Sequence, residues 1–278
     1  MASFAGVLLA GVLLGGIYSL VAIGLNLIFG VIRVVNFAQG EFVMLGMYAT
    51  VVAYTALHTD PYLALLLVFP LLFVFGMGVQ RFVLQPLQNV VLAITGGAAV
   101  SIHTAVSELT ITAGPVQVSV ARLVALAAVS VVAAGLQWAL RYTMMGKAVR
   151  AVAQDRRAAR LMGINVERTF MLTFGFGAGL AGVAGALLTP IFTLSPQIGG
   201  NFILAAFAVV VLGGLGSVMG AYIGGFLIGI TEALAGYYLD PALKQAVWFA
   251  IFIMVLVMRP TGLFGLAGAE EMGLRVQE

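Results

Sequence analysis

Nearly unbroken apolar runs, each about 20 residues long, are the feature that most limits what this chain can fold into. A bilayer core takes about 20 apolar residues per helical crossing. Runs of that length follow one another from Ala2 to Met258, interrupted only by short clusters of charge, Pro or Asn. Hydrophobic residues make up 62% of the chain, far more than the roughly 45 to 50% of soluble domains. An all-α polytopic membrane protein is therefore predicted.

Cutting the chain at its polar clusters predicts about eight or nine transmembrane helices in a single domain, residues 1–278. The first run has no basic flank before it and is too long for a signal-peptide core, so it is expected to be retained. The nine candidate spans are residues 4–29, 37–57, 62–82, 90–110, 120–140, 169–190, 202–217, 221–238 and 243–258.

The distribution of basic residues predicts the orientation, because cytoplasmic loops carry the excess of Lys and Arg. The loop of residues 141–168 holds seven of the 13 basic residues and is expected inside. Alternation of nine spans then places the N-terminus outside and the C-terminus in the cytoplasm. It also brings four further basic residues inside: Arg33, Arg81, Arg259 and Arg275.

The loop of residues 141–168 is the only long hydrophilic stretch, and its pattern predicts two short helices. Asp155 has the position of an N-cap for a helix that Gly163 ends, and Asn165 can cap the next helix. Ala158, Ala159 and Met162 are expected to share one narrow apolar face.

Two interpretations of this loop are open. A basic helix lying on anionic lipid headgroups is one. Docking to a cytoplasmic protein is the other, and it is favoured because a membrane-surface helix usually buries large apolar residues, whereas small ones suit a protein groove.

The stretch "VVNFAQGEFVML", residues 34–45, places Asn36, Gln39 and Glu41 between apolar runs. Asn36 and Gln39 have capping-box spacing, which predicts a helix that begins at Phe37. Glu41 is expected in the second turn, stabilised by the helix dipole and by Arg33. The cluster is a candidate gate at the inner mouth of a pathway.

Motifs for catalysis are missing from the sequence. It contains no cysteine, no phosphate-binding G-x-x-x-x-G-K-[ST] motif and no G-x-S-x-G motif. The two histidines, His58 and His103, are isolated. We therefore expect no enzymatic activity and no metal site. The net charge of +3 reflects membrane topology, so no nucleic-acid partner is expected either.

Glu232 is the main candidate for the rival class, an ion-coupled carrier, because an intramembrane carboxylate suggests a functional site. It lies near the middle of its predicted span, without an evident basic partner at similar depth. A structural or pathway-lining role is favoured over a proton relay, and Asn26 is expected to make an interhelical hydrogen bond.

Glycines at four-residue spacing predict close helix packing, since small residues let helix backbones approach in lipid. They are Gly11 and Gly15, Gly175 and Gly179, and Gly216, Gly220 and Gly224.

Four blocks of sequence together resemble the permease subunits of branched-chain amino acid ABC importers, over nearly the whole chain. They are "NFAQGEFVMLGMY" at 36–48, "GKAVRAVAQDRRAARLMGINVERTF" at 146–170, "VLGGLGSVMGAYIGG" at 211–225 and "RPTGLFG" at 259–265.

The resemblance implies the shorter, first permease of a heterodimer in a bacterial or archaeal plasma membrane. Its implied partners are a second homologous permease, two ATP-binding cassette subunits that bind ATP and Mg, and an external substrate-binding protein. The loop would carry a coupling helix, matched here by Arg150, Asp155, Ala158, Ala159, Leu161, Met162, Gly163 and Ile164. Branched-chain amino acids are the implied substrates, with urea or short amides as the alternative within the family.

Overall fold

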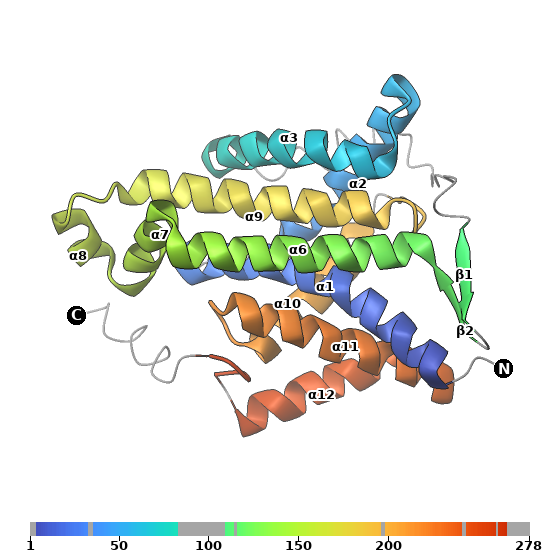
Figure 1. Cartoon of the computed structure of the whole chain (residues 1–278). Coiled ribbons are helices and arrows are strands. Elements are labelled where there is room, and N and C mark those ends of the chain that lie inside the picture. Colours follow the sequence, from blue (N-terminus) through green and yellow to red (C-terminus); the bar gives the residue numbers. More distant parts are fainter. Residues whose placement is uncertain are drawn as a thin grey trace.

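The computed structural model describes residues 4–32, 36–82, 109–113, 116–195, 198–240, 243–259 and 261–265 of the chain. Helices run roughly side by side, and one antiparallel hairpin lies at an end of the bundle (Figure 1). The elements are α1 (Phe4–Ile32), α2 (Gln39–Leu57), α3 (Pro61–Phe82), β1 (Thr110–Ala113), β2 (Val116–Ser119), α6 (Val120–Tyr142), α7 (Met144–Gln154), α8 (Arg156–Leu161), α9 (Val166–Leu188), α10 (Ile198–Gly213), α11 (Val218–Tyr238) and α12 (Lys244–Met258).

Six of the described helices are long and apolar enough to cross a membrane, and α10 and α12 are shorter apolar helices. Together they coincide with eight of the nine predicted spans, which confirms an all-α polytopic membrane protein. Most of the span predicted at 90–110, including His103, lies outside the described residues. Its last residue, Thr110, begins strand β1, so the hairpin was not predicted.

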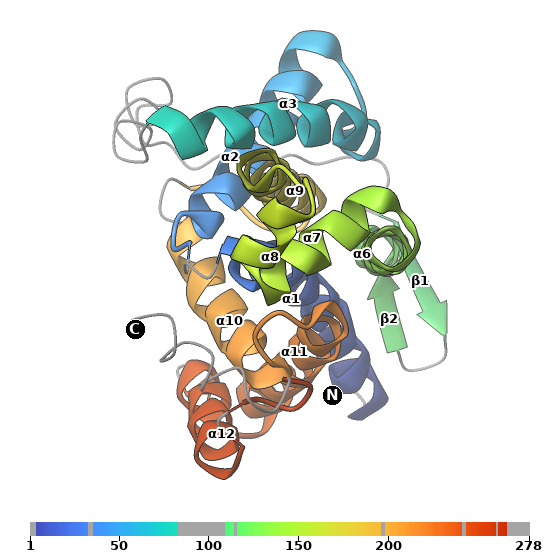
Figure 2. The same ribbon diagram turned by 90° about the vertical axis from the view of Figure 1, so that its left-hand side faces the viewer.

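Helices α1 and α9 form the centre of the bundle. In their most apolar stretches, 67% of the residues of α1 and 83% of those of α9 are buried. Viewed from the end, α2 and α3 lie on one side of them and α10, α11 and α12 on the other (Figure 2). Helix α6 packs along the flank with only 17% of such residues buried, so most of its surface faces outward.

Glycines allow the central helices to approach their neighbours closely. A Cβ atom on Gly15 of α1 would lie 2.7 Å from the carbonyl oxygen of Gly225 on α11. On α9, a Cβ at Gly175 would lie 2.9 Å from the carbonyl oxygen of Phe73 on α3. Real side chains do not fit at such distances, so the prediction of glycine-mediated packing is confirmed at these helix pairs.

The link between α10 and α11 differs from the prediction. Helix α10 ends at Gly213, four residues before the expected end of its span, and α11 begins at Val218. Gly214 and Gly216 have φ angles of +104° and +85°, in the left-handed region that glycine adopts without steric cost. Gly216 is therefore a turn residue, and its assignment to a helical packing face was wrong.

Asn26 of α1 holds this turn in place. Its Nδ2 donates to the carbonyl oxygens of Gly214 at 3.2 Å and Ser217 at 2.7 Å, and its Oδ1 accepts from the amide of Gly216 at 2.6 Å. Asn26 is 1% exposed, and a buried amide needs such partners because an unpaired polar group is costly in an apolar interior. The predicted interhelical hydrogen-bonding role is confirmed.

Candidate coupling surface and buried polar groups

The loop of residues 141–168 folds into the two short helices that the sequence predicts, and they extend beyond one end of the bundle (Figure 1). Asp155 caps α8: its Oδ1 accepts from the amides of Arg157 at 2.7 Å and Ala158 at 3.0 Å. Hydrogen bonds from the Ala158 and Arg157 amides, together with the charge of Arg157, hold the pKa of the Asp155 carboxyl below its ordinary value. Asp155 is therefore charged at neutral pH, the state that best accepts these bonds.

Helix α8 ends at its C-terminus as expected from Gly163. This glycine has φ +80°, its amide donates to the carbonyl of Arg160, and the amide of Ile164 donates to the carbonyl of Ala159, both at 3.0 Å. These two bonds make a Schellman motif, which ends a helix sharply. Asn165 then caps α9, because its Oδ1 accepts from the amide of Arg168 at 2.9 Å.

A small apolar cluster fixes the loop to the end of the bundle. Its buried members come from α1, α7, α8 and α9 and are Val31, Val149, Val152, Ala159 and Val166. Ala159 is only 3% exposed, whereas Ala158 and Met162 are exposed. The expectation that these three residues share one apolar face was wrong, since Ala159 faces the cluster and anchors the loop.

Arg156 adds a polar attachment that the sequence analysis missed. Its Nη2 donates to the carbonyl oxygen of Ile32 at 2.6 Å, and its guanidinium lies 5.0 Å from the centre of the Phe170 ring. The last carbonyls of α1 have no partner within the helix, and a cation suits this negative end of the helix dipole. Arg156 therefore fixes the loop to the end of α1.

The outer surface of α8 carries an exposed apolar ridge, formed by Ala158, Leu161 and Met162 and called the docking ridge below. Leu161 is 89% exposed and Met162 is 82% exposed. Large apolar side chains held outward on a capped helix are typical of a surface that another molecule covers. Arg150, also assigned to coupling, is exposed and donates to the Arg141 carbonyl at 3.3 Å.

The start of α2 contradicts the predicted capping box. The helix begins at Gln39, not at Phe37, and its N-cap residue, Ala38, has no side-chain oxygen that could accept a capping hydrogen bond. Asn36 Oδ1 instead accepts from the amide of Ala38 at 3.2 Å, as part of a turn. Gln39 is fully buried, and its Nε2 donates to the carbonyl of Gly177 on α9 at 2.9 Å. A long-range partner thus replaces the local one.

Glu41 lies in the first turn of α2, one turn earlier than expected, and is half-buried. Arg33, its predicted partner, lies outside the described residues. Between Gln39 and Glu41, Gly40 packs its backbone against Gly199 of α10. The sequence-predicted trio of Asn36, Gln39 and Glu41 therefore lies together where α2 meets α9 and α10.

Glu232 of α11 has partners that the sequence did not reveal. Tyr18 donates its hydroxyl proton to Glu232 Oε2 at 2.8 Å, and Lys244 Nζ of α12 lies 3.7 Å from Oε1. The expectation that it has no basic partner was wrong, because Lys244 begins the next helix and lies beside it. Glu232 is 8% exposed, so these contacts stabilise a carboxylate that would otherwise be costly in an apolar environment.

The chain matches the model of a protein family described as branched-chain amino acid transport system / permease component over residues 7–256. It is 33% identical to the high-affinity branched-chain amino acid transport system permease protein LivH of Escherichia coli, over 94% of this chain and 96% of that protein. It is 31% identical to the corresponding permease protein BraD of Pseudomonas aeruginosa, over 95% and 97% of the two chains. No solved structure matches the chain.

A bundle of apolar helices that agrees over nearly its full length with permease proteins defines a multi-pass transport protein of the inner membrane. The chain belongs to the branched-chain amino acid transport system permease family.

Proposed function

We propose that this chain is one permease subunit of an ATP-driven importer for branched-chain amino acids (leucine, isoleucine and valine). It would form half of the translocation pathway together with a second, homologous permease. Two ATP-binding cassette subunits would hydrolyse ATP and hold its Mg, and an external binding protein would deliver the substrate. The match with LivH over 94% of the chain carries this proposal.

The docking ridge is proposed to receive an ATPase subunit. Its supports are the Schellman end at Gly163, the buried anchor Ala159 and the exposure of Leu161. The exposed face carries larger side chains, Leu161 and Met162, than the alanine-rich face expected from the sequence. A protein partner is still favoured over a lipid surface, because α8 has only six residues and lies beyond the end of the bundle (Figure 1).

The topology is proposed to comprise nine spans with the N-terminus outside. Eight apolar helices are described. The ninth predicted span, at 90–110, lies outside the described residues except for Leu109 and Thr110. Helix α1 runs from the end that holds the β-hairpin to the end that holds α7 and α8 (Figure 1). If the basic loop of residues 141–168 faces the cytoplasm, Phe4 begins on the opposite side.

The polar residues at the start of α2 are proposed to act at an inner gate. The supporting observation is the close backbone contact of Gly40 with Gly199, which couples α2 directly to α10. Glu232 is proposed to line or stabilise the pathway rather than relay protons, because Tyr18 and Lys244 hold its carboxylate oxygens.

Uptake of labelled leucine tests the proposal in a strain that lacks this subunit and is complemented with it. Import should require the complemented gene and ATP, and unlabelled isoleucine and valine should compete for it. Competition by urea or short amides, without competition by valine, would instead identify the alternative substrates. Uptake that survives removal of the ATPase subunits and follows a proton or sodium gradient would support an ion-coupled carrier.

A further inference from the structure

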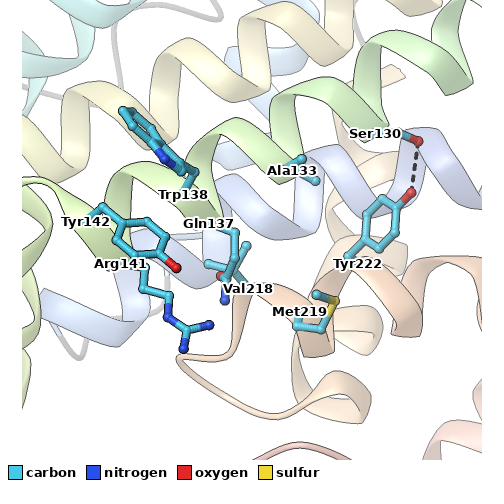
Figure 3. A pocket seen from close by; sticks show the side chains of 10 residues that line it. Ser130, Ala133, Gln137, Trp138, Arg141, Tyr142, Val218, Met219 and Tyr222 are labelled. Atoms are coloured by element: carbon cyan, nitrogen blue, oxygen red, sulfur yellow. Dashed lines mark hydrogen bonds between the residues drawn. The ribbon is translucent and has the colours of Figure 1, made fainter.

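A cavity of about 420 Å³ opens between the outward flank of α6 and the first turns of α11 (Figure 3). Its volume falls within the roughly 300 to 1,000 Å³ of ligand pockets. Its lining residues come from Ser130 to Tyr142 on α6 and from Val218 to Tyr222 on α11. We call this cavity the α6–α11 groove.

One end of the groove is cationic and aromatic. The Arg141 guanidinium lies 5.7 Å from the centre of the Tyr142 ring, and in the described part of the chain it forms no ion pair. No lining residue is acidic, and the sequence contains no Asp or Glu between residues 109 and 154. This end can therefore accept an anion without displacing an internal partner.

The opposite end is mostly apolar. Ala133, Val218 and Met219 line it, and a 2.9 Å hydrogen bond between the hydroxyl groups of Ser130 and Tyr222 joins the two helices there (Figure 3). Because this bond satisfies both hydroxyls, the surface offered to a ligand is largely hydrocarbon. The groove thus combines a cationic end with an apolar end along one helix.

The position of the groove matches the depth of a lipid headgroup. Trp138 and Tyr142 lie in the last two turns of α6 and are each 62% exposed. Trp and Tyr gather at membrane–water interfaces, and basic pockets between transmembrane helices bind anionic headgroups. The same end of the bundle leads into the basic loop of residues 141–168.

We propose that the α6–α11 groove binds an anionic phospholipid of the leaflet that faces the basic loop. The phosphate lies against the Arg141 guanidinium, and an acyl chain lies along Ala133 and Met219. The charge of the groove favours this occupant over a helix of the second permease. A helix seat in lipid relies on small residues that allow backbone contact, whereas Trp138, Tyr142 and Arg141 are bulky.

The test uses the complete importer, purified in detergent and stripped of lipid, with phosphatidylglycerol or phosphatidylcholine of equal chain length added. Lipid retention is measured by native mass spectrometry. Arg141→Gln removes the charge, Ala134→Phe fills the groove, and Arg160→Gln on α8 is the control with the same loss of charge. Retention of phosphatidylglycerol by each of the two groove variants should be at least about fivefold lower than that of the unmodified importer. The control should match the unmodified protein.

Equal retention of the two lipids by the unmodified importer would overturn the proposal. Undiminished phosphatidylglycerol retention in both groove variants would overturn it as well. If the variants lose the second permease while lipid retention stays unchanged, the groove is a subunit contact and the proposal is wrong. A variant that fails to assemble is replaced by the other, because the two act through charge and through volume separately.

Discussion

Truncation of the docking ridge should weaken the binding of the ATPase subunit without unfolding the permease. Leu161 is 89% exposed and makes little contribution to folding. Full burial of a leucine side chain is worth about 1.5 to 3 kcal/mol. If docking covers Leu161, Leu161→Ala should cost about 2 kcal/mol, which is about 30-fold in Kd at roughly 1.4 kcal/mol per tenfold change.

The assay is a titration of labelled ATPase subunits onto the permease pair in lipid nanodiscs, followed by leucine uptake in proteoliposomes. Met144→Ala is the matched control, because Met144 is 78% exposed in the same loop but does not belong to the ridge. Leu161→Ala should lower both affinity and uptake, and Met144→Ala should lower neither. An affinity for Leu161→Ala within threefold of the unmodified protein would refute the docking assignment.

Three further perturbations address the bundle and the loop. Gly225→Ala should lower the free energy of unfolding by about 1 to 3 kcal/mol, since the added Cβ would lie 2.7 Å from Cα of the facing Ser19. Gly200→Ala, whose Cβ would meet nothing within 4 Å, should show no such loss in detergent melting curves. Tyr18→Phe removes the hydrogen bond to Glu232 and should lower the free energy of unfolding by about 1 kcal/mol. Melting curves that match those of the unmodified protein would contradict this expectation. The lowered pKa of Asp155 means that its cap stabilises α8 fully above the ordinary value of 3.8 and loses this effect as the pH falls below it. The protection factor of the Ala158 amide against hydrogen exchange should therefore fall as the pH drops below 3.8, whereas in Asp155→Ala it should already be low at neutral pH.

Features that depend on near neighbours in the sequence were predicted well. The caps at Asp155 and Asn165 and the stop at Gly163 follow from bonds that reach only two to five residues along the chain. Long apolar runs likewise predicted nine spans, eight of which coincide with described helices, because the bilayer fixes their minimum length.

Features that depend on helix pairing were missed or misassigned. Gln39 finds its partner 138 residues away, and Arg156 finds Ile32 124 residues away. A helical pattern shows that Ala158 and Ala159 are adjacent, but not which of them faces the bundle. No sequence pattern links Lys244 to Glu232, because only the packing of α12 on α11 brings the two side chains together.

The extensive contact between α1 and α11 cannot form until the ribosome has made both helices. Tyr18 and Glu232 are 214 residues apart, and ribosomes add roughly 5 to 20 residues per second. About 10 to 40 s therefore pass between the emergence of the two helices. During that interval the glycine-lined face of α1 lacks the backbone against which it packs, and α9, which covers its other side, emerges only late in the interval. The nascent bundle must tolerate this exposed face in the bilayer until α11 has entered.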